Sequence, residues 1–216
     1  RSHALRGLRA LHRCLPEGSH RMKMDVVISG VGGQGNIFAS LVISEYAMKK
    51  NLTVIGAETI GAAQRGGAVV SHIRISDGEI FSPIISRGQA DLLIGMEYVE
   101  LLRHMRLLNP KGMYLLNAMK IPTVLNNMAL DEYPATEDIL KAIRKYCPHG
   151  YVVEASAAAK KLGNIQMTNV VMLGALVKVA PFFEYNEMKL LVAANSPTRF
   201  KDANLKGFEE GHKLIQ

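Results

Sequence analysis

Four glycines between a strand-like run and a helix-like segment restrict how the first part of this chain can fold. Residues 24–29 (MDVVIS) are mostly apolar, residues 30–35 read GVGGQG, and residues 36–50 repeat apolar side chains at helical spacing, with Ile37 and Leu41 on the apolar face. Glycines at such a junction permit a tight turn and a close approach of the backbone to another element or to a ligand. The pattern predicts the strand, loop and helix that begin an α/β domain.

Strand and helix signals alternate along the rest of the chain, with no internal repeat and no low-complexity linker. Apolar runs predict strands at residues 52–57, 68–75, 90–96, 112–117 and 151–154. Helices are predicted at 97–108 and 136–146, with two or three more from Ser156 onward, and the Asp77-Gly78 turn predicts a hairpin into a strand at 79–82. We therefore expect a three-layer, Rossmann-like α/β domain over residues 24–216, with a mostly parallel, partly mixed sheet.

The positive charge of the chain is concentrated at its start. The net charge is +7, but residues 1–23 hold six basic residues and one acidic residue, which leaves a net charge of only +2 for residues 24–216. We expect residues 1–23 to be a tag, a vector-derived segment or a disordered tail, with an organelle transit peptide as the alternative. A nearly neutral domain does not indicate a nucleic-acid partner.

Cysteine usage and hydropathy limit the chemistry further. Cys14 lies in the N-terminal stretch, so Cys147 is the one cysteine of residues 24–216, and neither a disulfide framework nor a thiolate-held cluster is expected there. No metal site is predicted. The longest apolar stretch, residues 170–183, contains Lys178 and is too short to span a bilayer. We expect a cytoplasmic protein without a membrane partner.

The first glycine loop is a candidate ligand site. It satisfies the generic G-x-G-x-x-G pattern, in which free backbone N–H groups and a helix N-terminus face an anion. Glu58 follows the second predicted strand, where a ribose-binding acid of a dinucleotide site would lie. The alternative is that the glycines merely let the strand and helix pack closely. The candidate residues in this loop are Gly30, Gly32, Gly33, Gln34, Gly35 and Asn36.

A second glycine loop follows the second predicted strand, so both loops should meet at one edge of the sheet. Its candidate residues are Glu58, Gln64, Arg65, Gly66 and Gly67. The Arg65 guanidinium is a planar, permanently charged group that suits a phosphate or a carboxylate. Two roles remain open for this loop: it binds a ligand, or it docks a partner subunit through Arg65.

The two loops and three further segments resemble the β subunit of the indolepyruvate:ferredoxin oxidoreductase family. The likeness is carried by GVGGQGN (30–36), ETIGAAQRGGAVVSHIR (58–74), Ser82-Pro83, ADLLIGMEYVELLR (90–103) and LGNIQMTNVVMLGAL (162–176). It covers nearly all of residues 24–216. The chain is similar, less closely, to the γ subunit or domain of pyruvate and 2-oxoglutarate:ferredoxin oxidoreductases.

This resemblance implies a small subunit that is inactive alone and takes part in the oxidative decarboxylation of an arylpyruvate such as indolepyruvate. Coenzyme A would accept the acyl group and ferredoxin the electrons. Thiamine diphosphate and [4Fe–4S] clusters would lie on a larger partner subunit, because this chain has no Gly-Asp-Gly thiamine motif and too few cysteines, so it holds no cofactor alone. No catalytic residue is assigned. The alternatives are a free-standing NAD-binding dehydrogenase domain and a non-catalytic assembly or regulatory domain.

Overall fold

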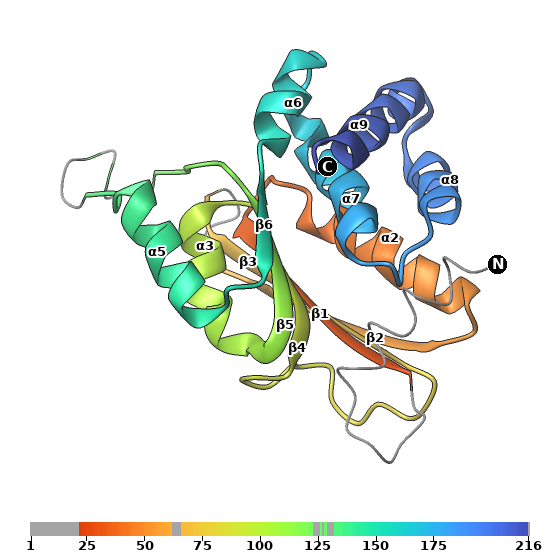
Figure 1. The fold of residues 1–216 in the computed structure, drawn as a ribbon. Coiled ribbons are helices and arrows are strands. Elements are labelled where there is room, and N and C mark those ends of the chain that lie inside the picture. Colours follow the sequence, from red (N-terminus) through yellow and green to blue (C-terminus); the bar gives the residue numbers. More distant parts are fainter. Residues whose placement is uncertain (1–21, 62–65, 123–125, 127, 129–131, 216) are drawn as a thin grey trace.

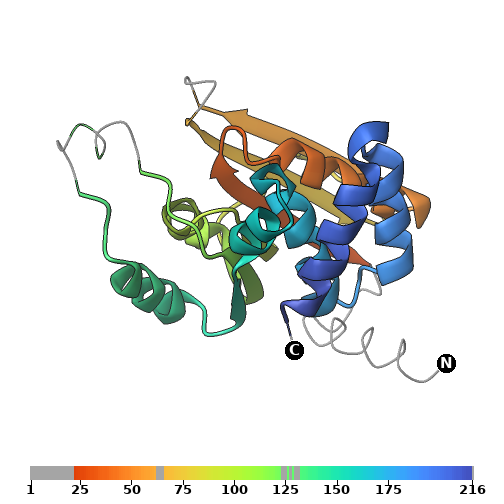
Figure 2. The same cartoon turned by 90° about the horizontal axis from the view of Figure 1, so that it is seen from above.

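The computed structural model describes residues 22–61, 66–122, 126, 128 and 132–215, which form three layers. A central sheet has α3 and α5 on one face and α2, α6, α7, α8 and α9 on the other (Figure 1, Figure 2). The strands are β1 (Lys23–Val31), β2 (Thr53–Ile60), β3 (Ala68–Ser76), β4 (Ala90–Gly95), β5 (Leu108–Asn117) and β6 (Gly150–Val153). The helices are α2 (Asn36–Lys49), α3 (Tyr98–His104), α5 (Thr136–Tyr146), α6 (Ala155–Lys161), α7 (Thr168–Val179), α8 (Tyr185–Asn195) and α9 (Lys201–Lys213), with short 3-10 turns η1 (Met105–Leu107), η2 (Ile165–Met167) and η3 (Thr198–Phe200).

The described part of the chain forms a six-stranded sheet in the order β2-β3-β1-β4-β5-β6. Three pairings are parallel, those of β1 with β4, β4 with β5 and β5 with β6. The other two are antiparallel, because β3 runs against both β1 and β2. The expected three-layer α/β fold with a mostly parallel, partly mixed sheet is confirmed. Since β2 runs in the same direction as β1, the carboxyl ends of these strands lie at the same edge.

The predicted hairpin after the Asp77-Gly78 turn is wrong. Residues 79–82 form no strand, and β3 pairs with β1 on one side and with β2 on the other. Because both edges of β3 are occupied, a returning strand has no free ladder to join. The segment is held instead by Ile85, which is buried and donates its N–H to His72 Nδ1 at 3.3 Å.

Helix α2 packs with the opposite face to the one expected. Ile37 and Leu41 were predicted to face the core, yet their side chains are 58% and 43% exposed. The buried side chains of α2 include Val42, Ile43 and Tyr46, which contact the sheet and the helices in front of it. The helix is apolar on both sides, so the spacing of its apolar residues did not indicate which side would be buried.

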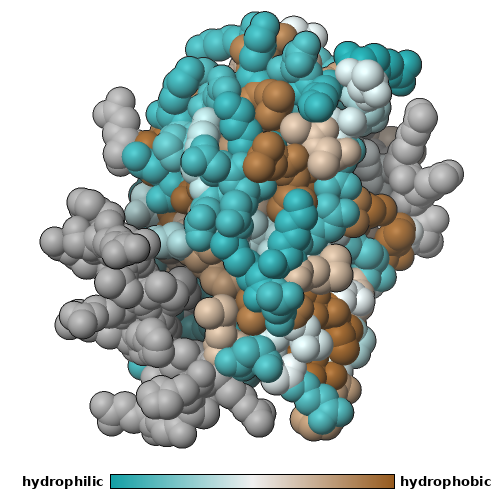
Figure 3. Space-filling model, turned by 90° about the vertical axis from the view of Figure 1, so that its right-hand side faces the viewer, coloured by the Kyte–Doolittle hydropathy of each residue, from teal (hydrophilic) through white to brown (hydrophobic). Residues whose placement is uncertain are grey.

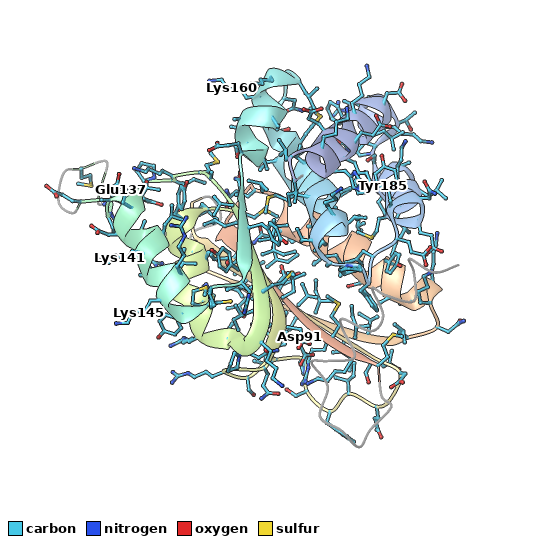
Figure 4. All side chains as sticks on the ribbon, viewed as in Figure 1. Asp91, Glu137, Lys141, Lys145, Lys160 and Tyr185 are labelled. Carbon is cyan, nitrogen blue, oxygen red and sulfur yellow. The ribbon has the colours of Figure 1, made fainter. Side chains whose placement is uncertain are left out.

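The larger core lies between the sheet and α2, α6, α7, α8 and α9, with α7 almost entirely buried. Helices α7 and α9 cross at glycines: a Cβ at Gly174 would overlap the carbonyl of Phe208, and one at Gly211 would overlap the carbonyl of Val171. The smaller core lies under α3 and α5, where α5 buries Ile139 and Ile143. Figure 4 shows the other side of α5, with Glu137, Lys141 and Lys145 turned outward.

A network of charged side chains lies at the edge of the sheet where β1 begins. The buried Asp25 carboxylate accepts hydrogen bonds from Arg74 Nε at 2.9 Å and Nη2 at 3.1 Å, and Lys23 Nζ lies 2.9 Å away. Asp91, labelled in Figure 4, accepts the Asp25 N–H at 2.8 Å and Asn109 Nδ2 at 2.7 Å, while burial raises its pKa. Each described charge here has a partner, which indicates a structural role.

Strand β1 begins at Lys23, and the Met22 N–H donates to Asp77 Oδ2 at 2.8 Å, so residues 22 and 23 lie against the sheet. Residues 1–21 of the predicted tail lie outside the described residues. No helix in the described ranges combines the length and the apolar character needed to cross a membrane.

Candidate functional site

The two glycine loops lie side by side at the edge where β1 and β2 end. The Gly32 N–H donates to the Gly67 carbonyl at 2.8 Å, and the Gly61 N–H donates to the Ala68 carbonyl at 2.9 Å. Gly30 pairs with Val69 across the β1–β3 ladder. The expectation that both loops meet at one edge is confirmed for their described residues.

Two residues of the second candidate loop, Gln64 and Arg65, lie outside the described residues. Gly66 is exposed and has a positive φ of 78°, a conformation that favours glycine.

The side chain of Gln34 braces the first loop from within. Its Oε1 accepts the Val31 N–H at 2.7 Å, and its Nε2 donates to the Met96 carbonyl at 3.0 Å. These contacts bridge the ends of β1 and β4, the two parallel strands whose following helices cover opposite faces of the sheet. Open α/β sheets place ligands at such a switch point. Here the Gln34 side chain occupies that crevice, and both of its polar atoms form hydrogen bonds that hold the loop in place.

Two of the candidate glycines have a packing explanation. A Cβ at Gly30 would lie 2.7 Å from Gln34 Oε1 and 2.9 Å from Asn36 Oδ1. Gly35 has a φ of 80°, and Asn169 Nδ2 donates to its carbonyl at 3.3 Å. By contrast, Gly33 is exposed with no heavy atom within 4 Å of an added Cβ. Gly30 and Gly35 therefore shape the loop, while Gly33 is open to a ligand or partner.

The N-terminus of α2 adds a positive electrostatic potential to this edge. Gly35 is its N-cap, no side-chain cap bond is found, and its first turn holds no acidic residue. Asn36 is buried and its Nδ2 donates to the Val69 carbonyl at 3.1 Å, whereas its Oδ1 has no hydrogen-bond partner among the described residues. Uncapped first-turn N–H groups and the helix dipole favour a negatively charged group.

Glu58 does not end its strand, because β2 continues to Ile60. Its Oε1 accepts Ser40 Oγ–H at 2.8 Å, and its Oε2 accepts the Ser71 hydroxyl. Both carboxylate oxygens are therefore held between α2 and β3. The expectation that the strand ends just before Glu58 is therefore wrong, and these hydrogen bonds give the dinucleotide interpretation no support at this residue.

A buried polar cluster beside Gln34 was missed by the sequence analysis. Asn117 Nδ2 donates to the Met96 carbonyl at 2.9 Å and to Ser156 Oγ at 2.8 Å, while the Ser156 N–H donates to Asn117 Oδ1 at 3.0 Å. Thr168 Oγ1 lies 3.3 Å from Ser156 Oγ. This cluster ties the ends of β4 and β5 to α6 and α7. The available signal was a polar residue, Asn117, at the carboxyl end of a predicted strand.

Glu97, which follows Met96 after the end of β4, is a second buried polar residue near this edge. It is 1% exposed, caps the start of α3 through the Glu100 N–H, and accepts the Tyr133 hydroxyl at 2.7 Å. Burial and the adjacent Glu97 carboxylate raise the pKa of Tyr133. The tyrosine therefore stays protonated and donates to Glu97.

The described residues contain no group of three or more His, Cys, Asp or Glu side chains placed to hold a metal ion. Cys147 is 3% exposed, and its thiol donates to the carbonyls of Gly112 and His149. Burial raises the pKa of this thiol, which disfavours the reactive thiolate. Cys147 therefore fills core space.

The geometry defines a class of protein. A three-layer α/β domain that gathers two glycine loops and an uncapped helix N-terminus at one edge is suited to engage an anionic group or a partner through its backbone. A family match makes the assignment specific: residues 25–214 match the model described as "Pyruvate ferredoxin/flavodoxin oxidoreductase". The chain belongs to this family.

Known relatives and structures agree with this assignment. The chain is 37% identical over 194 residues to the indolepyruvate oxidoreductase subunit IorB of Archaeoglobus fulgidus, covering 88% of this chain and 94% of the relative. Its fold resembles pyruvate oxidoreductase subunit PORC of Thermotoga maritima, with a TM-score of 0.67, 21% identity and coverage of 90% and 97% of the two chains. The resemblance to the indolepyruvate oxidoreductase family is confirmed.

A longer protein contains a similar fold. The 2-oxoglutarate:ferredoxin oxidoreductase of Magnetococcus marinus, solved with 2-oxoglutarate, coenzyme A and succinyl-CoA, matches with a TM-score of 0.66 and 18% identity, over 89% of this chain but 31% of that chain. The present chain is a small subunit of the 2-oxoacid:ferredoxin oxidoreductase type, and its relatives are parts of oxidoreductase complexes.

Proposed function

We propose that this chain is the small subunit of an indolepyruvate-type 2-oxoacid:ferredoxin oxidoreductase. The enzyme would decarboxylate an arylpyruvate oxidatively, form the acyl-CoA and pass the electrons to ferredoxin. The observation that carries the proposal is the 37% identity to an indolepyruvate oxidoreductase subunit over nearly the whole chain. A cytoplasmic location is part of the proposal.

A larger subunit would complete the enzyme. Thiamine diphosphate would supply the carbanion chemistry there, and iron–sulfur clusters the route for electrons. The described residues of this chain fit neither group, since the one free cysteine they include is buried and no metal-ligating cluster lies among them. We therefore assign to this chain the closure of the active-site cleft and the positioning of a substrate group.

Coenzyme A fits the described edge better than those groups do. Its phosphates are anionic, and the edge offers the uncapped start of α2 and the exposed backbone of Gly33 and Gly66. Backbone N–H groups at a helix N-terminus bind phosphate without a basic side chain. We propose that a coenzyme A phosphate lies along the two glycine loops, with Arg65 as the side chain that pairs with it.

The second role for Arg65 is the docking of a carboxylate on the larger subunit. Both roles need the forked guanidinium, which forms paired, charge-assisted hydrogen bonds that a lysine does not reproduce. The roles differ in what fails first when Arg65 is changed. Loss of a phosphate contact weakens the use of coenzyme A, whereas loss of a docking contact prevents assembly.

The test uses the small and large subunits expressed together, with Arg65→Ala and Arg65→Lys as variants. A phosphate role predicts normal assembly by size-exclusion chromatography and a Michaelis constant for coenzyme A raised by about 10- to 150-fold, the range for a hydrogen bond to a charged group. Arg87→Ala is the matched control, because Arg87 also precedes a glycine of positive φ but lies on the loop between β3 and β4.

Each outcome has a distinct meaning. Failed assembly in both Arg65 variants assigns the residue to docking, and normal values in both assays remove it from either role. Turnover of indolepyruvate by the small subunit alone, with thiamine diphosphate and a viologen dye, would contradict the proposed division of labour between the subunits.

A further inference from the structure

Helix α2 exposes three apolar side chains on one side, with Ser44 and Glu45 between the second and the third. Ile37, Leu41 and Met48 are 58%, 43% and 52% exposed. Their spacing of four and seven residues places them on one side of the helix. The opposite side is already buried against the sheet and the neighbouring helices. Exposed apolar side chains that gather on one side of a helix mark a candidate contact surface.

Strand β2, next to α2, is a sheet edge whose outer side pairs with no strand among the described residues. It is the first strand of the sheet, and its residues, Thr53 to Ile60, include no lysine, arginine or proline. Edge strands that face water usually carry such residues, because an open ladder otherwise invites another chain. The one charged side chain, Glu58, is held by Ser40 and Ser71. The strand therefore lacks the usual features that prevent association.

The exposed apolar side chains of α2 and the edge strand form one surface. The bond between Ser40 and Glu58 joins α2 to β2, and Ile60, which is 58% exposed, follows Glu58 on the same strand face. Ile37 follows the first glycine loop directly, and Ile60 precedes Gly61, where the second loop begins. We name Ile37, Leu41, Met48 and Ile60 the α2–β2 surface. It borders the candidate site.

The α2–β2 surface is also poor in charge where it meets the site. No charged residue occurs from Gly30 to Ser44. Interface cores are depleted in charged residues in the same way. Figure 3 shows the right-hand side of the molecule as drawn in Figure 1, where apolar side chains lie in separate groups among polar ones. Leu190 on α8 is 66% exposed, and single apolar residues of this kind are common on free surfaces.

We propose that the large, cofactor-bearing subunit docks on the α2–β2 surface and so encloses the two glycine loops between the subunits. This inference rests on the proposed function. The surface adjoins the candidate site, so a subunit bound there would lie beside the two glycine loops. In the Magnetococcus protein, a similar fold is 31% of one chain, so the rest of that polypeptide is permanently attached to it. A second copy of this chain would bring no redox group to the site.

The experiment measures binding of the immobilised small subunit to the separately purified large subunit by biolayer interferometry. Leu41→Glu and Ile37→Glu place an uncompensated charge in the proposed contact, which should raise the dissociation constant about tenfold or more. Leu190→Glu makes the same chemical change on α8 and should stay within about twofold of wild type. Circular dichroism and thermal melting should show all three variants folded. Ile60→Lys, which restores an edge-strand charge, provides a second test if a helix variant fails to fold.

The outcomes separate this inference from the function on which it rests. If wild type binds the large subunit and the α2–β2 variants bind equally well, docking occurs elsewhere and the inference is refuted. If wild type does not bind the large subunit at all, the proposed function fails first. If light scattering shows a wild-type dimer that Leu41→Glu converts to a monomer with normal binding to the large subunit, a second copy covers the surface and the inference is again refuted.

Discussion

Removing the Gln34 side chain should destabilise the protein through the loop it braces. Gln34→Ala deletes the hydrogen bonds to the Val31 N–H and the Met96 carbonyl. Two such bonds contribute about 0.5–1.5 kcal/mol each. The Met96 carbonyl keeps Asn117 as a donor, and water can reach the half-buried loop. We therefore expect the free energy of unfolding to fall by about 1–2 kcal/mol.

Gln34→Glu tests the geometry more sharply because it changes one atom of the brace. One carboxylate oxygen can still accept the Val31 N–H, but the other would face the Met96 carbonyl, which also accepts. We expect a loss of about 2–3 kcal/mol at neutral pH, as for a buried polar group without its partner. The contact with Met96 should raise the pKa of the new carboxyl in the folded state. The loss should therefore diminish as the pH falls through that pKa, because the protonated group can donate to Met96.

Urea denaturation followed by circular dichroism measures both effects. Each variant is compared with wild type at the same pH, so that other titrating groups cancel. Gln89→Glu, an exposed change on the loop before β4, is the control and should be nearly neutral. A Gln34→Glu variant as stable as wild type at neutral pH, or one whose deficit is independent of pH, would refute the assigned contacts.

Three further predictions concern packing, protonation and ligand choice. Gly174→Ala should lower the free energy of unfolding by about 1–3 kcal/mol, because its Cβ would overlap the Phe208 carbonyl. Gly207→Ala should raise it by about 0.5–1 kcal/mol, because the nearest atom to its Cβ would be 3.7 Å away. Thermal and urea unfolding measure both changes. Burial lowers the pKa of His72 and His104 from 6.5, so the unfolded chain binds more protons and stability should fall as the pH drops below that value. His72→Asn keeps an acceptor for the Ile85 N–H but does not titrate. The variant should therefore lose less of its free energy of unfolding between about pH 7.5 and 5.5 than wild type does. An unchanged pH profile would contradict this. NAD and NADH should not bind measurably in calorimetry, because Gln34 fills the crevice and Glu58 is engaged; a micromolar dissociation constant, about −8 kcal/mol, would restore the dehydrogenase alternative.

The predictability of the fold from sequence depends on whether the signal is local. The first strand, its glycine loop and α2 follow from neighbouring residues, and the predicted helix at 136–146 agrees with α5. Strand β3 pairs with β2, its neighbour in sequence, but it also pairs with the more distant β1. This second, long-range pairing excludes the hairpin expected at Asp77-Gly78. The buried face of α2 was likewise ambiguous, because Ile37 and Val42 are equally apolar and lie on opposite sides.

In the candidate site, too, some features follow from local sequence and others depend on long-range contacts. Strand direction predicted that the two glycine loops would meet, since carboxyl ends of strands running the same way share an edge. The sequence could not reveal that Gln34 turns inward to the Met96 carbonyl, 62 residues away. Nor could it show that Ser40 and Ser71 take up Glu58. Side-chain hydrogen bonds across distant segments are set by tertiary packing, which a linear pattern does not contain.

The crossing of α7 and α9 has a consequence for how the chain matures during synthesis. Strand β1 is made early but lies in the middle of the sheet, and Phe208 of α9 lies in the same core as β1 residues such as Val26. This core can therefore form completely only after α9 has been synthesised. Until then, the apolar side chains of the earlier strands and helices are not fully covered. Such long-range closure is slow and exposes the nascent chain to chaperones. Joining a second polypeptide is then a step that follows the synthesis of α9.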